Sequence, residues 1–340
     1  MQTKQKVSLI LISLIFLTTC RTVKKKSFPE VLNSDEKVVY LEGHDKSSGL
    51  YAFYFMDVVI IDPKTAKKFY VTNDIYYDLG PAISADGNYI SFISAREFRS
   101  YTSYQIQGIG APSSLYIYNI KKQTMKKVSL DDKILSYFYR EGYYFYSDTT
   151  EFIYSTKNKI NIINIKTKEQ RTVKNIKELE LSNWRISRNK EMIVVSGYDV
   201  NAGYRTTLIV WNLSTGEEIK IPILEGDAFI GDIDTEKGKI LYTVVINRKK
   251  KKLYEYHISE KKSIEIILPQ GQIEFPNYKS FCYTKNGNII GIATIVKTIK
   301  NKKNINGTDE ILEYYIHENK FKQLTNDGLI KYQMVYWYKK

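Results

Sequence analysis

The feature that most constrains the fold is a strand-turn-strand pattern that the chain repeats six times. In each copy an alternating apolar segment leads through a short polar turn into a second alternating segment, which is typical of a β-hairpin. The copies are DVVIIDPKTAKKFYV from residue 57, LYIYNIKKQTMKKVS from 115, INIINIKTKEQRTV from 160, LIVWNLSTGEEIKI from 208, LYEYHISEKKSIEI from 253 and ILEYYIHENKFKQL from 311. The first strand of each hairpin ends at Asp62, Asn119, Asn164, Asn212, His257 and His317, at steps of 45 to 60 residues.

A second pattern precedes each hairpin. Its clearest copy, GPAISADGNYISFISA at residues 80 to 95, reads as a strand, a turn at Asp86-Gly87 and another strand. Weaker copies begin at residues 33, 146, 186, 232 and 283. Each unit therefore holds four strands, termed a, b, c and d in chain order. The 29 tyrosines and 14 phenylalanines suit pleated, half-buried strands. Four-stranded units at a fixed period predict an all-β chain folded as a six-bladed β-propeller, whose blades bury their faces against one another.

The two ends of the repeat region indicate how the ring closes. The heptapeptide KFYVTND at residues 68 to 74 leads into strand a of the next unit, whereas the similar KFKQLTND at residues 320 to 327 is followed only by GLIKYQMVYWYKK. The segment from Gly328 to Tyr338 should therefore be a strand a without a unit of its own. The first unit begins with strand b, from Val38 to Glu42. We predict that the C-terminal strand completes the first blade and closes the ring, which leaves only short protected edges.

The phrase PAISADGNYISF, residues 81 to 92, resembles the repeat of the TolB-type propellers, in which a strand is followed by Ser-x-Asp-Gly and an apolar strand. The propellers of prolyl oligopeptidases contain the same phrase. This resemblance implies a six-bladed propeller of four-stranded blades over residues 31 to 340. No catalytic residue is carried over by it, because the likeness to the oligopeptidases covers their propeller alone.

The N-terminus MQTKQKVSLILISLIFLTTC has two lysines, an apolar run from Val7 to Leu17 and a cysteine at position 20. Eleven helical residues span roughly 16 Å, which is too short for a membrane span and typical of the apolar part of a signal peptide. Leu17 to Cys20 resemble a bacterial lipobox, although Thr19 departs from the small residues usual before the cysteine. The resemblance implies cleavage before Cys20 and lipidation of that residue. An ordinary secretory signal that happens to contain a cysteine is the alternative.

These assignments divide the chain into a lipoprotein signal peptide at 1–19, a short basic tether at 20–30 and the propeller at 31–340. The formal charge of +14 becomes +12 when Lys4 and Lys6 leave with the signal peptide. The remaining lysines are scattered over strand-like segments, as expected of a solvated surface. Export also removes chromosomal DNA and cytosolic RNA as partners. If Cys20 is lipidated, Cys282 has no partner and is expected to be a buried strand residue.

Residues that could carry catalysis are few. The three histidines are His44, His257 and His317, and we assign the last two to blade architecture because they share the repeat position of the asparagines. No Gly-x-Ser-x-Gly nucleophile motif occurs. We therefore expect no catalytic residues, no bound metal and no cofactor. A metal-dependent lactonase would need acidic residues on the inner strands, and Asp232 and Asn183 keep that alternative open.

The connections between strands b and c vary most in length, and the longest runs from Arg96 to Ser113. In a propeller the b–c and d–a connections emerge on one face, and insertions that gather on one face are typical of a binding surface. Aromatic and arginine side chains are enriched at binding hot spots. The predicted partner-binding residues are Arg96, Arg99, Tyr101, Tyr104, Tyr198, Tyr204 and Arg205. The alternative is that these long loops are tolerated insertions without function.

Together these features predict a monomeric, lipid-anchored propeller that acts as a non-catalytic protein-binding or scaffolding module of the cell envelope. Its expected place is the periplasmic side of the outer membrane or the cell surface. The expected partner is an envelope protein or peptide, with membrane contact through the N-terminal lipid and no nucleic acid bound. A propeller hydrolase or lactonase, and a carbohydrate- or peptide-binding surface lipoprotein, are the alternatives. Four converging ligands at the channel mouth would favour the enzyme.

Overall fold

The compact unit that carries the repeats spans Val31–Lys340 in the computed structural model. The structure describes residues 29–45, 54–74, 76–96, 114–147, 150–156, 158–176, 179–199, 205–247, 250–268, 273–274, 281–295, 297–299, 302–304, 309–327 and 329–339. None of the helices in these ranges has the length and apolar character of a membrane span. Cys20 and the rest of the predicted signal peptide lie outside the described residues.

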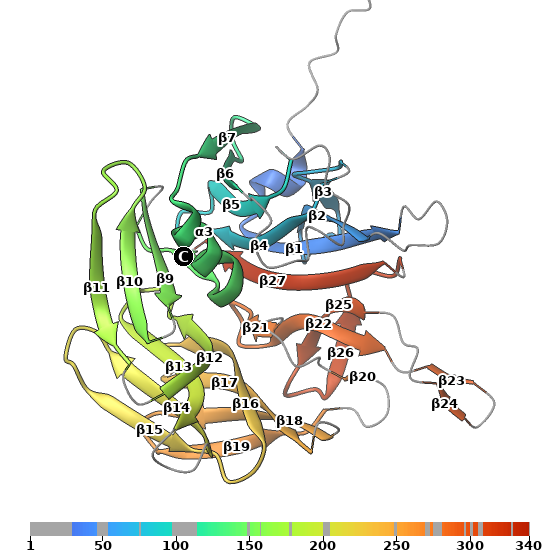
Figure 1. Cartoon of the computed structure of the whole chain (residues 1–340). Helices are drawn as coiled ribbons and strands as arrows, with labels where there is room; N and C mark the ends of the chain where they lie inside the picture. The colour runs from blue at the N-terminus through green and yellow to red at the C-terminus, as the bar shows by residue number, and fades with distance from the viewer. Residues whose placement is uncertain are drawn as a thin grey trace, which may run out of the picture. The chain divides into compact units, whose positions relative to one another are not determined.

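Six antiparallel sheets form the blades of a propeller (Figure 1), which confirms the predicted fold class. Blade 1 consists of β27 (Ile330–Tyr338), β1 (Glu36–Asp45), β2 (Tyr54–Ile61) and β3 (Lys68–Tyr70). Blade 2 consists of β4 (Asp78–Ile83), β5 (Tyr89–Ser94), β6 (Ser114–Asn119) and β7 (Thr124–Val128). Blade 3 consists of β8 (Tyr143–Phe145), β9 (Glu151–Thr156), β10 (Lys159–Asn164) and β11 (Gln170–Asn175).

The second half of the chain builds three further blades. Blade 4 consists of β12 (Leu179–Ile186), β13 (Met192–Asp199), β14 (Arg205–Asn212) and β15 (Glu218–Pro222). Blade 5 consists of β16 (Asp227–Asp234), β17 (Lys239–Ile246), β18 (Lys250–His257) and β19 (Lys262–Ile266). Blade 6 consists of β20 (Ile273–Glu274) and β21 (Phe281–Tyr283), which both pair with β22 (Ile289–Ile295), followed by β25 (Asp309–Tyr315) and β26 (Lys320–Gln323).

Within the described ranges, four elements lie outside the blade pattern. They are the 3-10 helix η1 (Glu30–Asn33), the helix α3 (Asp132–Glu141) and the ribbon of β23 (Lys297–Ile299) with β24 (Lys302–Asn304). The ribbon extends the b–c connection of blade 6. First strands of neighbouring blades contact one another, so the a strands are the innermost ones and surround the central channel.

The ring closes through its two ends, as predicted. Strand β27 runs antiparallel to β1, with registers from Gly43 opposite Ile330 to Glu36 opposite Tyr338. In Figure 1 the red C-terminal strand lies beside the blue first strand. Because β1 carries β2 and β3 on its other side, the C-terminal strand supplies the innermost position of blade 1.

Apolar side chains pack between adjacent blades, where they form most of the core. The cluster between blades 3 and 4 contains Trp184, which is 1% exposed, together with residues of both sheets such as Ile153 and Ile193. Similar clusters join blades 2 and 3, 4 and 5, 5 and 6, and 6 and 1. Because each blade presents apolar residues on both faces, no blade can bury its surface alone, and the ring forms as a unit.

The c–d turns explain why Asp and Asn recur at the ends of the c strands. The Asp62 carboxylate accepts a hydrogen bond from Lys64 N at 2.9 Å, and the Asn164 side chain accepts one from Lys166 N at 2.9 Å. Such side chains cap a turn by mimicking its backbone. Four residues after the strand end, each turn has a residue with positive φ, namely Ala66, Gln123, Lys168, Gly216, Lys261 and Asn319. By this spacing the sixth strand end is Tyr315, so the prediction of His317 was wrong by two residues.

The repeated sequence ends the outermost strand of a blade and connects it by hydrogen bonds to the adjacent strand of the same blade. Thr72 Oγ1 accepts a hydrogen bond from Val58 N at 2.8 Å, and Thr325 Oγ1 accepts one from Ile311 N at 2.9 Å. The closing aspartate of each copy pairs with a cation of the next blade, since Asp74 contacts Arg96 at 3.0 Å and Asp327 contacts Lys331. The same sequence recurs because the same junction is built twice.

Helix α3 interrupts the d–a connection of blade 2 and was not expected from the repeat. The Asp131 side chain caps its N-terminus by accepting from Lys133 N, and Gly142 ends it with φ +80°. Its buried face carries Phe138, whose ring stacks on Tyr143 with centroids 4.5 Å apart. The helix therefore covers the gap between blades 2 and 3 on the face that also carries the b–c connections.

Candidate functional site

A pocket to which all six blades contribute lies at one mouth of the central channel. It has a volume of about 360 Å³, within the range of about 300–1,000 Å³ typical of small-ligand sites. Its lining comes from the innermost strands of all six blades and the turns that follow them: Ala82 to Ala85, Tyr144, Arg185, Ile186, Arg188, Lys190, Gly231 and Asp232, Phe281 and Cys282, and Met334 to Tyr338. The pocket therefore opens on the face of the a–b and c–d turns.

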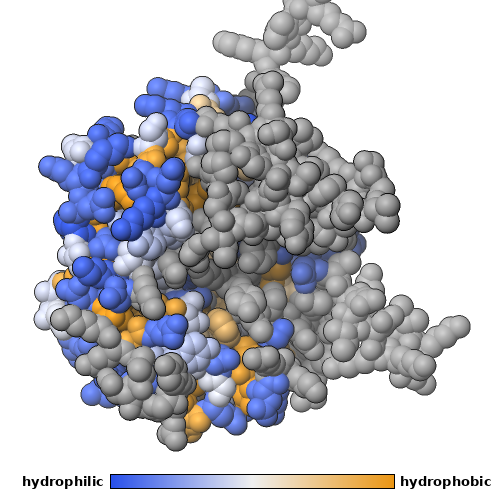
Figure 2. All heavy atoms as spheres, viewed as in Figure 1, coloured by the Kyte–Doolittle hydropathy of each residue, from blue (hydrophilic) through white to orange (hydrophobic). Residues whose placement is uncertain are grey.

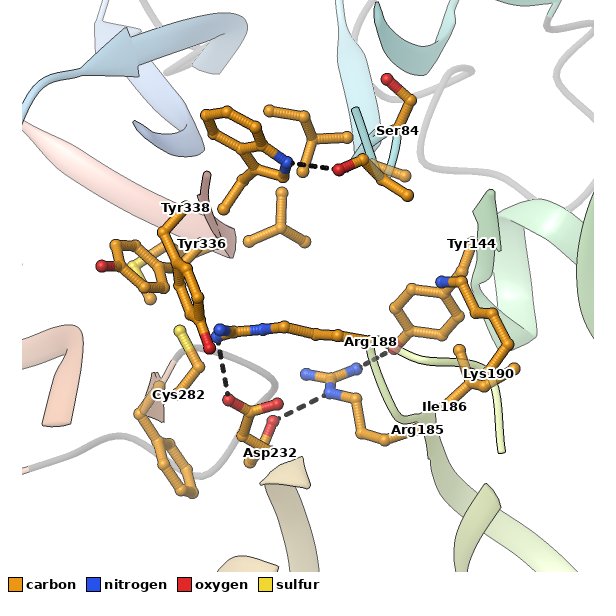
Figure 3. A pocket seen from close by; sticks show the side chains of 18 residues that line it. Ser84, Tyr144, Arg185, Ile186, Arg188, Lys190, Asp232, Cys282, Tyr336 and Tyr338 are labelled. Carbon is orange, nitrogen blue, oxygen red and sulfur yellow. Dashed lines mark hydrogen bonds and ion pairs between the residues drawn. The ribbon is translucent and has the colours of Figure 1, made fainter. Parts of the chain in front are cut away.

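Arg188 crosses this pocket and is fixed at its far end. Its Nη2 donates to the Tyr283 carbonyl at 2.9 Å and lies 3.4 Å from an Asp232 oxygen. The guanidinium also lies 4.3 Å from the centre of the Tyr338 ring and 5.4 Å from that of Tyr336. Figure 3 shows the side chain reaching across the pocket toward these rings. Arg188 thus joins the turn of blade 4 to blades 5, 6 and 1.

Asp232 has its oxygens engaged by this arrangement. The backbone N–H groups of Tyr283 and Ile233 both donate to the carboxylate at 2.9 Å. Burial raises the pKa of Asp232, and the charge of Arg188 opposes that shift. The carboxylate therefore accepts the hydrogen bond that connects β21 to β16. Its negative charge is balanced by the ion pair with Arg188.

Arg185 projects into the pocket from β12, whereas Arg188 lies in the turn that follows this strand. Its Nε donates to the Gly231 carbonyl at 3.1 Å, and its Nη1 donates to the Tyr144 hydroxyl. Its guanidinium also lies 5.7 Å from the centre of the Tyr144 ring. Among the described residues its second terminal nitrogen, Nη2, has no hydrogen-bond partner, so one donor face of this guanidinium is open to a ligand (Figure 3).

The a–b turns at this mouth share one construction. In blade 2, Ser84 Oγ donates to Asp86 at 2.6 Å and accepts from Tyr89 N at 3.0 Å. In blade 4, Ser187 Oγ makes the same two bonds, to Asn189 at 2.7 Å and from Met192 N at 2.9 Å. Acidic and amide residues in these turns therefore hold the backbone, and Asp86 lies in the turn that the sequence predicts.

A group of three carboxylates lies on the opposite face. Oxygens of Asp57, Asp74 and Asp78 lie within 4.8 Å of one another, and this is the one such group among the described residues. Arg96 occupies the same place, 3.0 Å from Asp74 and 3.5 Å from Asp78. Burial raises the pKa of Asp78 to about 7, although Arg96 opposes the shift. The guanidinium supplies the positive charge that a cation would bring.

The structure describes only part of the predicted partner surface. Arg96 is 13% exposed and lies 5.0 Å from the centre of the Tyr116 ring, so its guanidinium is held within blade 2. The Tyr198 hydroxyl donates to Asp227 at 3.2 Å. Four of the named residues, Arg99, Tyr101, Tyr104 and Tyr204, lie outside the described residues, as does the side chain of Arg205. Binding of a partner by this set stays a prediction.

The repeat pattern does not predict the pocket, because it defines the innermost strands by their apolar residues alone. The signal was present in NWRIS and the following turn, where Arg185, Arg188 and Lys190 place three cations near the channel. The expected strand position of Cys282 is confirmed, since its side chain is 9% exposed on β21. On the face that Figure 2 shows, the surface of the described residues is mainly hydrophilic, and its hydrophobic residues form small separate groups.

No family model and no curated protein matches the chain. Among solved structures, TolB from Acinetobacter baumannii matches 92% of this chain and 68% of its own at a TM-score of 0.61 and 11% identity. The putative TolB from Agrobacterium tumefaciens matches 79% of this chain and 88% of its own, at a TM-score of 0.55 and 10% identity. A chain of the nidogen/laminin complex matches 90% of this chain and 99% of its own, at 0.54 and 7%. At such low identities the likeness concerns the fold: the chain is a TolB-like six-bladed β-propeller.

Proposed function

We propose that this protein is an exported, lipid-anchored binding module without catalytic activity, which captures a segment of an envelope protein or peptide in the channel mouth. One observation carries the proposal: a pocket of about 360 Å³ to which all six blades contribute, lined by guanidinium groups and tyrosine rings. Arginine and tyrosine are the residue types enriched at binding hot spots. Because the pocket walls come from six separate strands held by the ring, the site is preformed, which lowers the entropic cost of binding.

A binding role fits the chemistry of the lining better than hydrolysis does. Asp232 is the one carboxylate in the lining, and its oxygens accept two backbone N–H bonds and the Arg188 contact. A lactonase would need several oxygen ligands around one cation, and three cationic side chains line this pocket instead. Cys282 lies in the lining, but burial raises the pKa of its thiol, which disfavours the nucleophilic thiolate.

Capture in the channel mouth is tested by a substitution at an exposed residue that blocks the entrance. Ala85 is exposed and lines the pocket, so Ala85→Trp should fill the entrance without removing a side-chain contact. We expect this variant to lose at least about tenfold in the yield of its principal crosslinked partner in whole cells. The matched control, Lys121→Trp, lies in an exposed turn of the same blade and should crosslink like wild type.

The same assay decides between the two faces. The triple variant Arg99→Ala, Tyr101→Ala, Tyr104→Ala alters the long b–c connection and leaves the channel mouth unchanged. If the triple variant loses the partner and Ala85→Trp keeps it, the binding surface is the b–c face, and capture in the channel mouth is refuted.

Lipid anchoring is tested at Cys20. Wild-type protein should partition into the detergent phase after membrane extraction, because two or three acyl chains anchor a protein stably. Cys20→Ala should leave the chain unprocessed or release it into the aqueous phase. Intact-mass measurement of the mature chain provides the check: an unmodified N-terminus at a residue other than 20 would rule out the lipoprotein assignment.

A further inference from the structure

We propose that the channel mouth is a carboxylate-binding site, in which Arg185 and Lys190 bind the anionic group and the tyrosine rings of β27 pack against the rest of the ligand. The inference rests on the proposed function, because it names the chemistry of the group that the same pocket would capture. It goes further in assigning individual donors and a ligand class.

The charge of the lining favours an anion. Arg185, Arg188 and Lys190 face one carboxylate, Asp232, which leaves a net charge of +2 in the pocket. Arg188 and Asp232 form a pair at 3.4 Å, so the excess resides on Arg185 and Lys190. Charges in a concave, partly dry site are screened less than charges on an open surface. An anionic group that enters would therefore compensate two cations that the described part of the protein leaves unbalanced.

Lys190 occupies a position that the equivalent turns give to glycine. The a–b turn of blade 2 has Gly87 at φ +68° and that of blade 6 has Gly287 at φ +83°, whereas blade 4 has Lys190 at φ +64°. A left-handed conformation is unfavourable for a residue with a side chain. Here that residue lines the pocket, and no ion pair of its ammonium group is seen among the described residues. Lys168 and Lys261 have a similar positive φ in exposed turns, so the backbone conformation alone is an ordinary feature of these turns. What distinguishes Lys190 is that it lines the pocket, and a cation in that place points to an anionic ligand.

The protonation state of Lys190 is compatible with this role. Burial, together with the charge of Arg188, lowers the pKa of the ammonium to about 8. The group is therefore charged at neutral pH, and a bound anion would stabilise the charged form further.

The donors and the apolar wall select the kind of anion. Arg185 and Lys190 both line the pocket, and a carboxylate offers two acceptor oxygens for two such donors, whereas a phosphate group presents three strong acceptor oxygens. The other wall consists of Tyr336 and Tyr338, whose rings lie 5.8 Å apart, with Met334 beside them. An aromatic wall next to two cations fits an organic acid with an apolar body, such as a peptide that ends in a free carboxylate.

The test uses the mature chain in detergent and probes of defined charge. Isothermal titration with benzoate should give saturable binding, and benzamide, which has the same shape without the charge, should bind at least about tenfold more weakly. Inorganic phosphate should not compete. Acetyl-Gly-Phe with a free carboxylate is compared with its C-terminal amide. Tighter binding of the free carboxylate would show that the site accepts a peptide terminus as well as a small organic acid. Equal affinity for benzoate and benzamide, or binding of phosphate without benzoate, would overturn the proposal.

The chain offers a matched pair of variants. Lys190→Gly should lower benzoate affinity at least about tenfold while its melting temperature equals or exceeds that of wild type, because glycine suits a positive φ. Lys168→Gly is the control, since Lys168 has a similar φ of +67° in an exposed turn outside the pocket. A Lys190→Gly variant that melts like wild type and keeps full benzoate affinity would contradict the assignment of Lys190.

Failure of this inference can be told apart from failure of the proposed function. If benzoate does not bind but Ala85→Trp still loses the crosslinked partner, the mouth captures a partner through other chemistry, and the carboxylate assignment is wrong. If benzoate binds in a Lys190-dependent manner and Ala85→Trp keeps its partner, the carboxylate site stands while capture of a protein partner in the mouth does not.

Discussion

A chain that ends at Asp327 should fail to fold into a soluble propeller. The deletion removes β27, the innermost strand of blade 1, and with it the buried side chains of Met334 and Tyr336. Strand β1 would then present an unpaired edge next to Val38 and Leu41, which are fully buried in the intact ring. An exposed apolar edge favours aggregation. We expect a loss of more than about 5 kcal/mol, comparable with the whole stability of a domain, and a chain found mainly in inclusion bodies.

The control for this deletion is a chain that ends at Tyr338. It lacks only Lys339, which is exposed, and the final residue, so the register between β27 and β1 is preserved. Solubility and thermal melting of this control should match those of the full chain. If the chain that ends at Asp327 also melted like the full chain, β27 would contribute nothing to ring closure, and the closure described above would be wrong.

Lys331→Met should destabilise the seam between β27 and blade 6 by about 3–5 kcal/mol, because it removes a cation that is paired with a buried carboxylate. Lys331 Nζ lies 3.3 Å from Glu310, and both side chains are fully buried between β27 and β25. Thr325 donates to the same carboxylate at 2.5 Å. The variant thus removes the cation and keeps the anion. Chemical denaturation of the two proteins measures the difference.

Two further variants make this expectation specific. Lys331→Met combined with Glu310→Gln removes both charges and should recover part of the loss. Lys320→Met breaks an ion pair with Glu318 whose side chains are 75% and 62% exposed, and surface pairs contribute about 0–1 kcal/mol. Loss of stability in Lys320→Met equal to that in Lys331→Met would show that burial of the seam pair has no special effect.

The stability of the seam should also decrease in acid, because Asp327 pairs with Lys331 of β27 and with Lys68. Burial raises the pKa of Asp327, but hydrogen bonds from Lys331 and Lys68 outweigh it and lower the pKa to about 2. A carboxyl whose pKa is lowered on folding stabilises the protein above its unfolded value of about 4. That contribution is present at neutral pH and is lost as the pH falls from about 4 to about 2.

The ring could be predicted from the sequence because its determinants are local. Alternating apolar residues define the strands, and Asp or Asn at a fixed place caps each hairpin turn, as Asp62 and Asn164 do. Ring closure could be predicted as well, because the heptapeptide that ends the outermost strand of blade 1 has a similar octapeptide at residues 320 to 327, which precedes a single further strand. The shift of the sixth strand end from His317 to Tyr315 shows the limit of such counting, since a turn is defined by its backbone and not by one residue type.

The channel mouth could not be predicted in the same way, because its contacts join residues far apart in the chain. Arg188 meets Tyr338 only when blade 4 and the C-terminal strand face each other across the ring. Trp337 donates to the Ala85 carbonyl at 2.8 Å and covers Gly87, where a Cβ would lie 2.3 Å from the indole. Such approaches depend on blade number and strand twist, which strand periodicity does not contain. Helix α3 escaped notice because the repeat assigns its segment to a connection, although Ile134, Leu135 and Phe138 follow helical spacing.

The likeness to TolB structures and the geometry of the pocket support different parts of this account. The former concerns the arrangement of blades at 10% and 11% identity. The latter depends on residues of this chain alone, above all the cations of β12 and the turn after it. Binding in the channel mouth is therefore a claim about Arg185 and Lys190, and it is tested on these residues and their neighbours.

Site-specific photocrosslinking at the mouth tests the central claim most directly. A small aliphatic analogue that carries a photoreactive diazirine is placed at position 85, which is exposed and lines the pocket; it leaves the entrance open and should crosslink in intact cells to one defined partner. The same analogue at position 121, exposed in a turn of the same blade but outside the pocket, should not. Lys190→Gly in the position-85 protein should abolish the crosslink. Identical crosslinks from positions 85 and 121, or a crosslink at 85 that Lys190→Gly leaves unchanged, would contradict capture of an anionic partner in the channel.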